Sequence, residues 1–140
     1  MALFQRPTAI RRKTLRMILG ASKDAYPNEF GAILRAEDGV ITELLLIPGT
    51  IGGNRHAIFR LYNMPTDFSV VGTVHSHPSG AFHPSDEDRH LFSKFGGVHI
   101  IAGNPYDETT WAVWTTASFK QSGVRRPSTS TRSLIRGCTR

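Results

Sequence analysis

The chain has 140 residues, a net charge of +6 and 39% hydrophobic residues, values that fit one soluble globular domain with its own core. Its single cysteine, Cys138, excludes an internal disulfide and a cysteine-rich zinc knuckle, so histidines and carboxylates would have to hold any metal. No apolar run is long enough to cross a bilayer, and residues 1–20 lack the continuous apolar segment of a signal peptide. We therefore expect an intracellular, cytoplasmic protein that does not bind membranes.

The positive charge is concentrated near the C-terminal end of the chain. Six of the 17 Lys and Arg residues occur from Lys120 onward, where there is no Asp or Glu. Residues 1–119 hold eleven basic and eleven acidic residues, so this part is neutral overall. A neutral body disfavours nucleic-acid binding, which usually needs a basic face on the folded domain. We assign residues 1–119 to one folded domain and residues 120–140 to a basic, Ser/Thr/Arg-rich flexible tail.

The first half of the chain is predicted to form a helix and three strands. An apolar periodicity predicts an amphipathic helix over residues 8–25, with Ile10 and Met17 on its apolar face, and Pro27 ends it. The predicted strands are, in order, Phe30–Arg35, Val40–Ile47 and His56–Tyr62. A tight-turn sequence at residues 37–39 joins the first two strands into a hairpin, and a glycine-rich loop at 48–54 precedes the third.

The second half is predicted to combine strands with one helix. Ser69–His75 is an apolar run without alternation, as expected of a central strand that is buried on both faces. A loop leads to a helix over Ser85–Phe95, for which Ser85 would be the N-cap residue. Two more strands are predicted at Val98–Ala102 and Thr110–Ala117. Together these elements predict an α+β fold in which a mixed, mostly antiparallel curved sheet of five to six strands is flanked by helices.

The central strand ends in the sequence His75-Ser76-His77. Because alternate strand residues point to the same face, the two imidazoles can reach one metal ion; the alternative is a pair of partly exposed histidines. Asp88 favours the metal, since it lies on the inward face of the following helix, where a carboxylate needs a partner. Ser85 and Asp88 also match a capping box, in which both side chains bind amides at the helix start. The spacing alone leaves both interpretations of Asp88 open.

Together with Glu29, these residues resemble a known catalytic motif. The chain fills every position of E…H-S/T-H-x7-S-x2-D, the JAMM motif of the MPN+ metalloproteases, with Glu29, His75-Ser76-His77, Ser85 and Asp88. The segments around Glu29 and His75 also resemble those of the family, and the resemblance covers residues 8–118. It implies a single MPN domain of the minimal prokaryotic type, with the activity of a zinc-dependent peptidase or isopeptidase.

The resemblance also implies a role for each motif residue. His75, His77 and Asp88 would bind one Zn²⁺ ion and leave its fourth position for water. Glu29 would act as the general base, and Ser85 would donate a hydrogen bond to the oxyanion that forms during amide hydrolysis. Weaker candidates for the surroundings of the metal or for a substrate loop are Ser76, Pro78 and His83. For His83, a plain loop position is the preferred interpretation.

Well-known relatives in this family cleave bonds after the C-terminal Gly-Gly of ubiquitin or a ubiquitin-like modifier. The resemblance therefore implies a small ubiquitin-like or sulfur-carrier protein and its conjugates as partner and substrate. The short segment between Phe95 and Val98 leaves no room for a long insertion that would hold a ubiquitin chain. Two alternatives stay open: a RadC-like protein linked to DNA metabolism, suggested by the sequence at residues 77–80, and a non-catalytic MPN scaffold. The neutral body weighs against the first and the complete motif against the second. The sequence also allows a homodimer.

Overall fold

The computed structural model describes residues 6–46, 69–95 and 97–115. The elements in these ranges are β1 (Ala9–Ile10), α1 (Arg12–Ala25), β2 (Gly31–Glu37), β3 (Val40–Leu46), β4 (Val70–His77), α3 (Asp86–Phe95), β5 (Val98–Gly103) and β6 (Trp111–Thr115). The loop predicted at 48–54, the strand predicted at 56–62 and the tail predicted at 120–140 lie outside the described residues.

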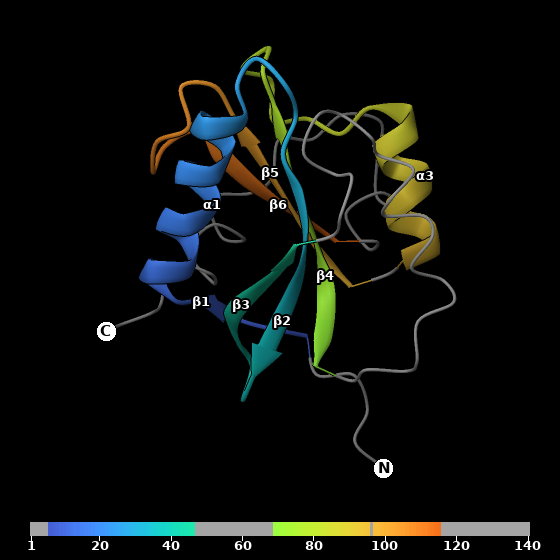
Figure 1. Cartoon of the computed structure of the whole chain (residues 1–140). Coiled ribbons are helices and arrows are strands. Elements are labelled where there is room, and N and C mark those ends of the chain that lie inside the picture. Colours follow the sequence, from blue (N-terminus) through green and yellow to red (C-terminus); the bar gives the residue numbers. More distant parts are fainter. Residues whose placement is uncertain (1–5, 47–68, 96, 116–140) are drawn as a thin grey trace.

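The described strands form one mixed six-stranded sheet in the order β1-β3-β2-β4-β5-β6. The pairs β1–β3 and β4–β5 are parallel, and the other neighbouring strands are antiparallel. Figure 1 shows α1 and α3 on opposite sides of this sheet. The predicted α+β fold and the central place of β4 are therefore confirmed. In the part of the chain that the structure describes, no helix is long and apolar enough to span a membrane.

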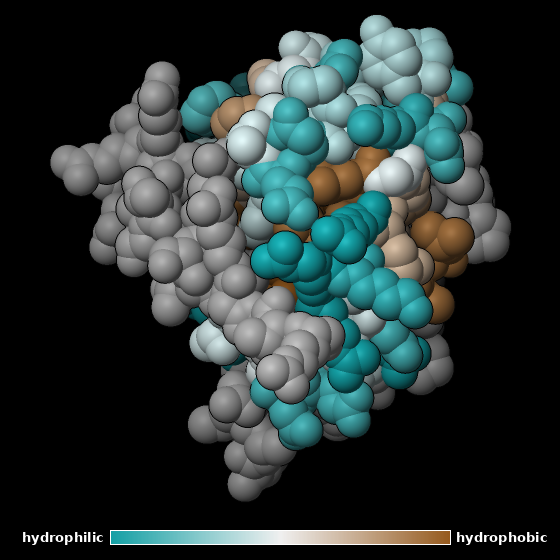
Figure 2. Space-filling view, turned by 90° about the vertical axis from the view of Figure 1, so that its left-hand side faces the viewer, coloured by the Kyte–Doolittle hydropathy of each residue, from teal (hydrophilic) through white to brown (hydrophobic). Residues whose placement is uncertain are grey.

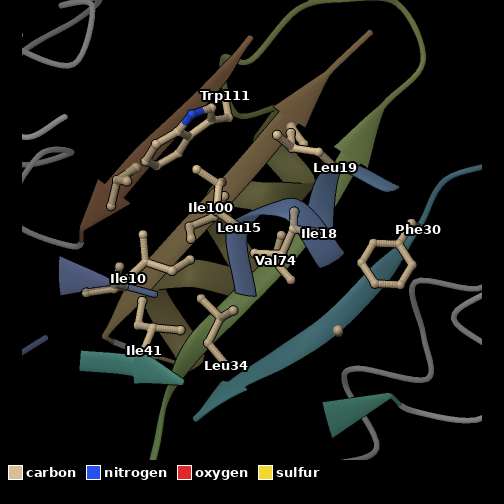
Figure 3. Close-up of a cluster of buried hydrophobic side chains, with 14 of the residues drawn as sticks. Ile10, Leu15, Ile18, Leu19, Phe30, Leu34, Ile41, Val74, Ile100 and Trp111 are labelled. Carbon is tan, nitrogen blue, oxygen red and sulfur yellow. The ribbon is translucent and has the colours of Figure 1, made fainter. Parts of the chain in front are cut away.

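The main hydrophobic core lies between α1 and the sheet (Figure 3). Leu15 and Ile18 of α1 belong to the same buried cluster as Val74 of β4 and Ile100 of β5. A second, smaller cluster lies on the α3 side and consists of Leu91, Phe92, Ile101, Ala112 and Trp114, with Phe82 packed against it. The two clusters use opposite faces of β5 and β6, as expected from the alternation of strand side chains.

The first helix begins later than the sequence predicted. Ala9 and Ile10 pair with β3 in parallel register, and the Arg11 amide donates a hydrogen bond of 3.0 Å to the Ile41 carbonyl oxygen. Ile10 is buried, and it lies on this short strand and not on a helix. Its apolar character also fits the helical periodicity, which is why the sequence predicts a helix from residue 8. The correct start of α1 is Arg12.

The buried face of α1 also differs in one residue from the prediction. Met17 was placed on the apolar face but is 51% exposed, whereas Leu15, Ile18 and Leu19 face the core. The outer face of this helix and its start is hydrophilic (Figure 2), with these exposed basic residues: Arg11, Arg12, Lys13, Arg16 and Lys23. The neutral total of residues 1–119 therefore includes a locally basic surface on α1.

The β2–β3 hairpin forms as predicted, around Asp38 and Gly39. Their φ angles of 51° and 77° lie in the left-handed region, which glycine adopts freely and aspartate tolerates in turns. On its other edge β2 pairs antiparallel with β4, so that Gly31 lies opposite His75. The pairing of β2 with β4 thereby brings the segment that precedes β2 to the end of the central strand.

Candidate metal centre

His75, His77 and Asp88 converge where β4 ends, and all three are buried. The Nε2 atoms of the two histidines lie 3.0 Å apart. Oδ1 of Asp88 is 3.1 Å from Nε2 of His75, and Oδ2 is 3.1 Å from Nε2 of His77. The three residues that the sequence singled out as metal ligands thus form one compact group that could hold a metal ion.

The fold explains this convergence. His75 and His77 are two residues apart on β4, so they project to the same side, toward α3. Asp88 lies in the first turn of α3, and Leu91 and Phe92 anchor the next turn in the smaller cluster. The Phe92 ring also packs near His75, with ring centroids 6.0 Å apart. Strand alternation and helix packing together place the carboxylate over the two imidazoles.

The donor atoms of this group fit a cation. The carbonyl oxygen of Ala81 can only accept, so Nδ1 of His77, which is 2.8 Å away, must donate, and Nε2 of the neutral ring then presents a lone pair. That lone pair faces a carboxylate oxygen and a second imidazole nitrogen, so a cation or a proton is needed between them. Donors that share a tetrahedral zinc ion lie roughly 3.3 Å apart for bonds of ~2.0–2.1 Å, and the observed separations are 3.0 and 3.1 Å.

The electrostatic surroundings keep Asp88 ionised. Burial by itself would raise the pKa of the Asp88 carboxyl group, because desolvation disfavours the charged form. When a proton and not a metal ion lies between Asp88 and each of these imidazoles, hydrogen bonds from His75 and His77, together with that of the Ser85 amide, outweigh burial and hold the pKa of Asp88 well below its usual range. A carboxylate that stays charged in a buried position is the form that binds a metal.

The capping box is present as well. The Ser85 amide donates to Oδ2 of Asp88 at 2.8 Å, and the Asp88 amide donates to Oγ of Ser85 at 3.1 Å. The two interpretations of Asp88 are therefore compatible, because one oxygen accepts the amide of the helix cap and also faces His77. In the capping bond the Ser85 hydroxyl is the acceptor, so its own hydrogen can be donated to another group. Ser85 itself is exposed.

Ser76 connects β4 to the segment that carries Glu29. The buried Ser76 hydroxyl accepts a hydrogen bond of 2.8 Å from the Phe30 amide, and the Ser76 amide donates to the Phe30 carbonyl oxygen at 2.9 Å. These bonds continue the β2–β4 register and set half-buried Glu29 opposite His77. Phe30 belongs to the core on the α1 side, so alternation directs Glu29 to the other face, which is that of His75 and His77.

The remaining weak candidates lie in the loop after β4. Pro78 is half-buried, and its carbonyl oxygen accepts a hydrogen bond of 3.4 Å from Nδ2 of Asn104. His83 is exposed and stacks on Phe82 at 6.3 Å between ring centroids, with the Trp114 ring at 5.9 Å. The structure therefore does not bring His83 into the group formed by the two β4 histidines and the aspartate.

The sequence does not predict the contacts that backbone carbonyl groups make in this loop. Nδ1 of His77 donates a hydrogen bond to the Ala81 carbonyl oxygen, and Nε1 of Trp114 donates one to the Phe82 carbonyl oxygen. Side-chain motifs carry no signal for such acceptors, because every residue has a carbonyl group. Of these groups the sequence places only the tryptophan, within the strand predicted at Thr110–Ala117.

Comparisons with known proteins agree with the fold and the motif. Residues 11–116 match the family of prokaryotic homologues of the JAB domain. A probable metalloprotease of Haloferax volcanii is 39% identical over 127 residues, which cover 84% of this chain and 75% of the relative. A solved JAB1/MPN domain protein from Archaeoglobus fulgidus is 40% identical, with a TM-score of 0.63 over 77% of this chain and 89% of the other.

A second solved structure is described as JAMM, a metalloprotease-like zinc site in the proteasome and signalosome. It is 37% identical, with a TM-score of 0.63 over 86% of this chain and 96% of the other. The chain thus belongs to the JAMM/MPN family, among the prokaryotic homologues of the JAB domain.

Proposed function

We propose that this protein is a zinc-dependent metalloprotease. The observation that carries the proposal is the convergence of His75, His77 and Asp88, whose donor atoms lie 3.0–3.1 Å apart in a buried position. The similarity to a probable metalloprotease and to a protein described by its zinc site supports both the activity and the metal.

The side chains around this group have distinct tasks in amide hydrolysis. A zinc ion, when bound, would supply Lewis-acid activation of a water molecule and of the scissile carbonyl group. Glu29, opposite His77 and on the same face, would accept the proton of the attacking water and pass it to the leaving amine. Ser85 would donate its hydroxyl hydrogen to the carbonyl oxygen as negative charge develops, a contribution of about 2.7–4 kcal/mol if it equals that of other oxyanion donors.

For the substrate, we propose the amide or isopeptide bond after the C-terminal Gly-Gly of a ubiquitin-like or sulfur-carrier protein in the cytoplasm. Membership in the JAMM/MPN family supports this choice. Two glycines have no side chains, so such a tail can closely approach the buried metal-ligand candidates and can pair with a strand edge through its backbone.

A cleavage assay with matched variants tests the proposal. Purified protein would be incubated with Gly-Gly-linked modifier fusions and isopeptide conjugates, with zinc or with a chelator. We expect cleavage that the chelator abolishes and one zinc ion per chain. His75→Ala should lose the metal, whereas Glu29→Gln should retain it and lose activity by about 10²–10⁴-fold. Glu37→Gln, which removes an exposed carboxylate of the hairpin, is the control and should remain active.

Two outcomes would contradict different parts of the proposal. Conjugates left intact by a zinc-loaded protein would exclude the Gly-Gly substrate but leave the metal centre in place. Full activity of Glu29→Gln would exclude the role of Glu29 as the general base.

A further inference from the structure

The loop after β4 is attached to the domain at two consecutive carbonyl groups. Nδ1 of His77 donates to the Ala81 carbonyl oxygen at 2.8 Å. Nε1 of Trp114 donates to the next carbonyl oxygen, that of Phe82, at 3.0 Å. The first bond orients the ring of His77, a metal-ligand candidate. The second holds the Phe82 carbonyl group, which directly follows the Ala81 carbonyl group along the chain. An indole N–H can only donate and a carbonyl can only accept, so the direction of the second bond is certain.

The same loop is packed closely on the end of β5. Gly103 pairs with His77 in parallel register, and a Cβ atom at position 103 would lie 2.7 Å from the Gly80 carbonyl oxygen. The amides of Gly80 and Asn104 both donate to the His77 carbonyl oxygen, at 3.1 and 3.2 Å. The loop therefore has little room to move toward the sheet, and the hydrogen bond from the indole of Trp114 restrains it at a second point.

The donor side of this restraint is firmly held. Trp114 is only 6% exposed and belongs to the smaller core cluster, together with Leu91 and Phe92 of α3. Its ring cannot leave the Phe82 carbonyl without giving up this packing. The position of the indole is thus set by the core, and the loop takes its position from the indole.

We infer that Trp114 is a positioning residue of the metal centre, which acts through the peptide groups of Phe82 and Ala81 to keep Nε2 of His77 directed at the metal. The inference rests on the proposed metal site. Groups that bind the second nitrogen of a ligating histidine typically contribute 10–100-fold to metal affinity. Trp114 is one peptide group further away, so we expect its indole N–H to contribute about 3- to 10-fold.

The chain offers a matched control in Trp111. This residue lies on the same strand, is buried, and also donates its Nε1 hydrogen to a backbone carbonyl oxygen at 3.0 Å. Its acceptor is Glu108, in the turn between β5 and β6, and its ring belongs to the cluster on the α1 side. Trp114→Phe and Trp111→Phe therefore remove the same kind of bond, one on the face of the sheet that carries His77 and the other on the opposite face.

The test compares zinc affinity in the two variants. Metal-free full-length protein would be titrated with zinc in competition with a chromophoric chelator, and thermal unfolding of the metal-free forms would report the cost in stability. Trp114→Phe should weaken zinc binding by about 3- to 10-fold, while Trp111→Phe should keep the wild-type affinity even though it is destabilised. Equal affinities of the two variants, whether both unchanged or both reduced, would overturn the inference.

Two further measurements keep the result decisive. In the metal-free protein, the Nδ1–H proton of His77 can be followed by NMR, and its exchange with water should accelerate in Trp114→Phe but not in Trp111→Phe. Gly103→Ala pushes the same loop from the sheet side and leaves the indole intact, so it should also weaken zinc binding. Unchanged proton exchange in Trp114→Phe would count against the inference. A wild-type protein that fails to bind zinc would instead contradict the proposed function.

Discussion

Nε2 of His77 lies 3.1 Å from Oδ2 of Asp88, the same oxygen atom that accepts the Ser85 amide hydrogen bond that caps α3. The start of the helix and the candidate metal centre therefore share one carboxylate oxygen. A change at Asp88 would affect the metal site and the helix together, and only its neighbours allow the two contributions to be measured separately.

Ser85 allows this separation. Ser85→Ala removes the acceptor of the Asp88 amide and should cost about 0.5–2 kcal/mol of stability, together with a loss of activity of about 10²–10³-fold if the hydroxyl stabilises the oxyanion. Ser85→Asp should restore the cap but not the activity, since a carboxylate cannot donate, and Ser85→Thr should restore both. Urea unfolding and a cleavage assay measure the two effects. Full activity in Ser85→Asp would exclude the oxyanion role.

Ser76 is expected to act through the position of Glu29. Ser76→Ala leaves the buried Phe30 amide without its acceptor, which should cost about 1–3 kcal/mol. Activity should fall while zinc affinity stays near that of the wild type, because the metal ligands are unchanged. The control is Ser22→Ala, a buried serine of α1 whose hydroxyl donates to the Ile18 carbonyl oxygen at 2.8 Å, on the opposite side of the sheet from α3. A Ser76→Ala protein as active as Ser22→Ala would contradict this role.

Removal of the metal should lower the stability of the domain. A ligand that binds only the folded state adds about 2.7 kcal/mol at a concentration 100 times its dissociation constant. Zinc should therefore raise the melting temperature of the wild type, and a chelator should reverse the change. His75→Ala should show neither effect. Hydrogen exchange should locate the loss of protection in α3, since Asp88 joins this helix to β4.

The buried Tyr106 side chain is expected to make the stability of the domain depend on pH in the alkaline range. Burial raises the pKa of its phenol, Ser76 opposes this, and the negative charge of Glu29 adds to it. A folded pKa above the unfolded value near 10 means that the contribution to stability is complete below about pH 10 and is lost as the pH rises toward the folded pKa. Tyr106→Phe should weaken this alkaline loss, as measured by unfolding between pH 8 and 11. An identical profile in the variant would assign the loss to another group.

Most of the fold could be predicted because the sequence has clear local patterns of apolar, turn and capping residues. The hairpin, the buried central strand and the helix that begins after Ser85 follow from turn residues, apolar runs and a capping pattern. The error at the start of α1 has a physical cause. Ile10 is buried on a strand, and a single apolar residue fits a strand and a helix equally well when no cap residue marks the boundary.

The candidate site was predicted in part for a similar reason. His75, His77 and Asp88 are close in sequence, so strand and helix geometry suffice to bring them together. The placement of Glu29 depends on the register between β2 and β4, which brings Phe30 to Ser76, 46 residues further along the chain, and no local pattern specifies this register. The resemblance to the JAMM motif indicated that residue, and the hydrogen bonds between Phe30 and Ser76 supply the physical reason for its position.

The metal group joins two segments of a chain that has only one cysteine. Binding of one ion by His77 and Asp88 would close a short loop, residues 78–87, much as a disulfide does, and a covalent bridge around a loop of this order contributes about 3 kcal/mol in the chain-entropy model. Unlike a disulfide, this cross-link can be removed by a chelator at any time. The lifetime of the loop in the presence of a protease should then follow the free zinc concentration.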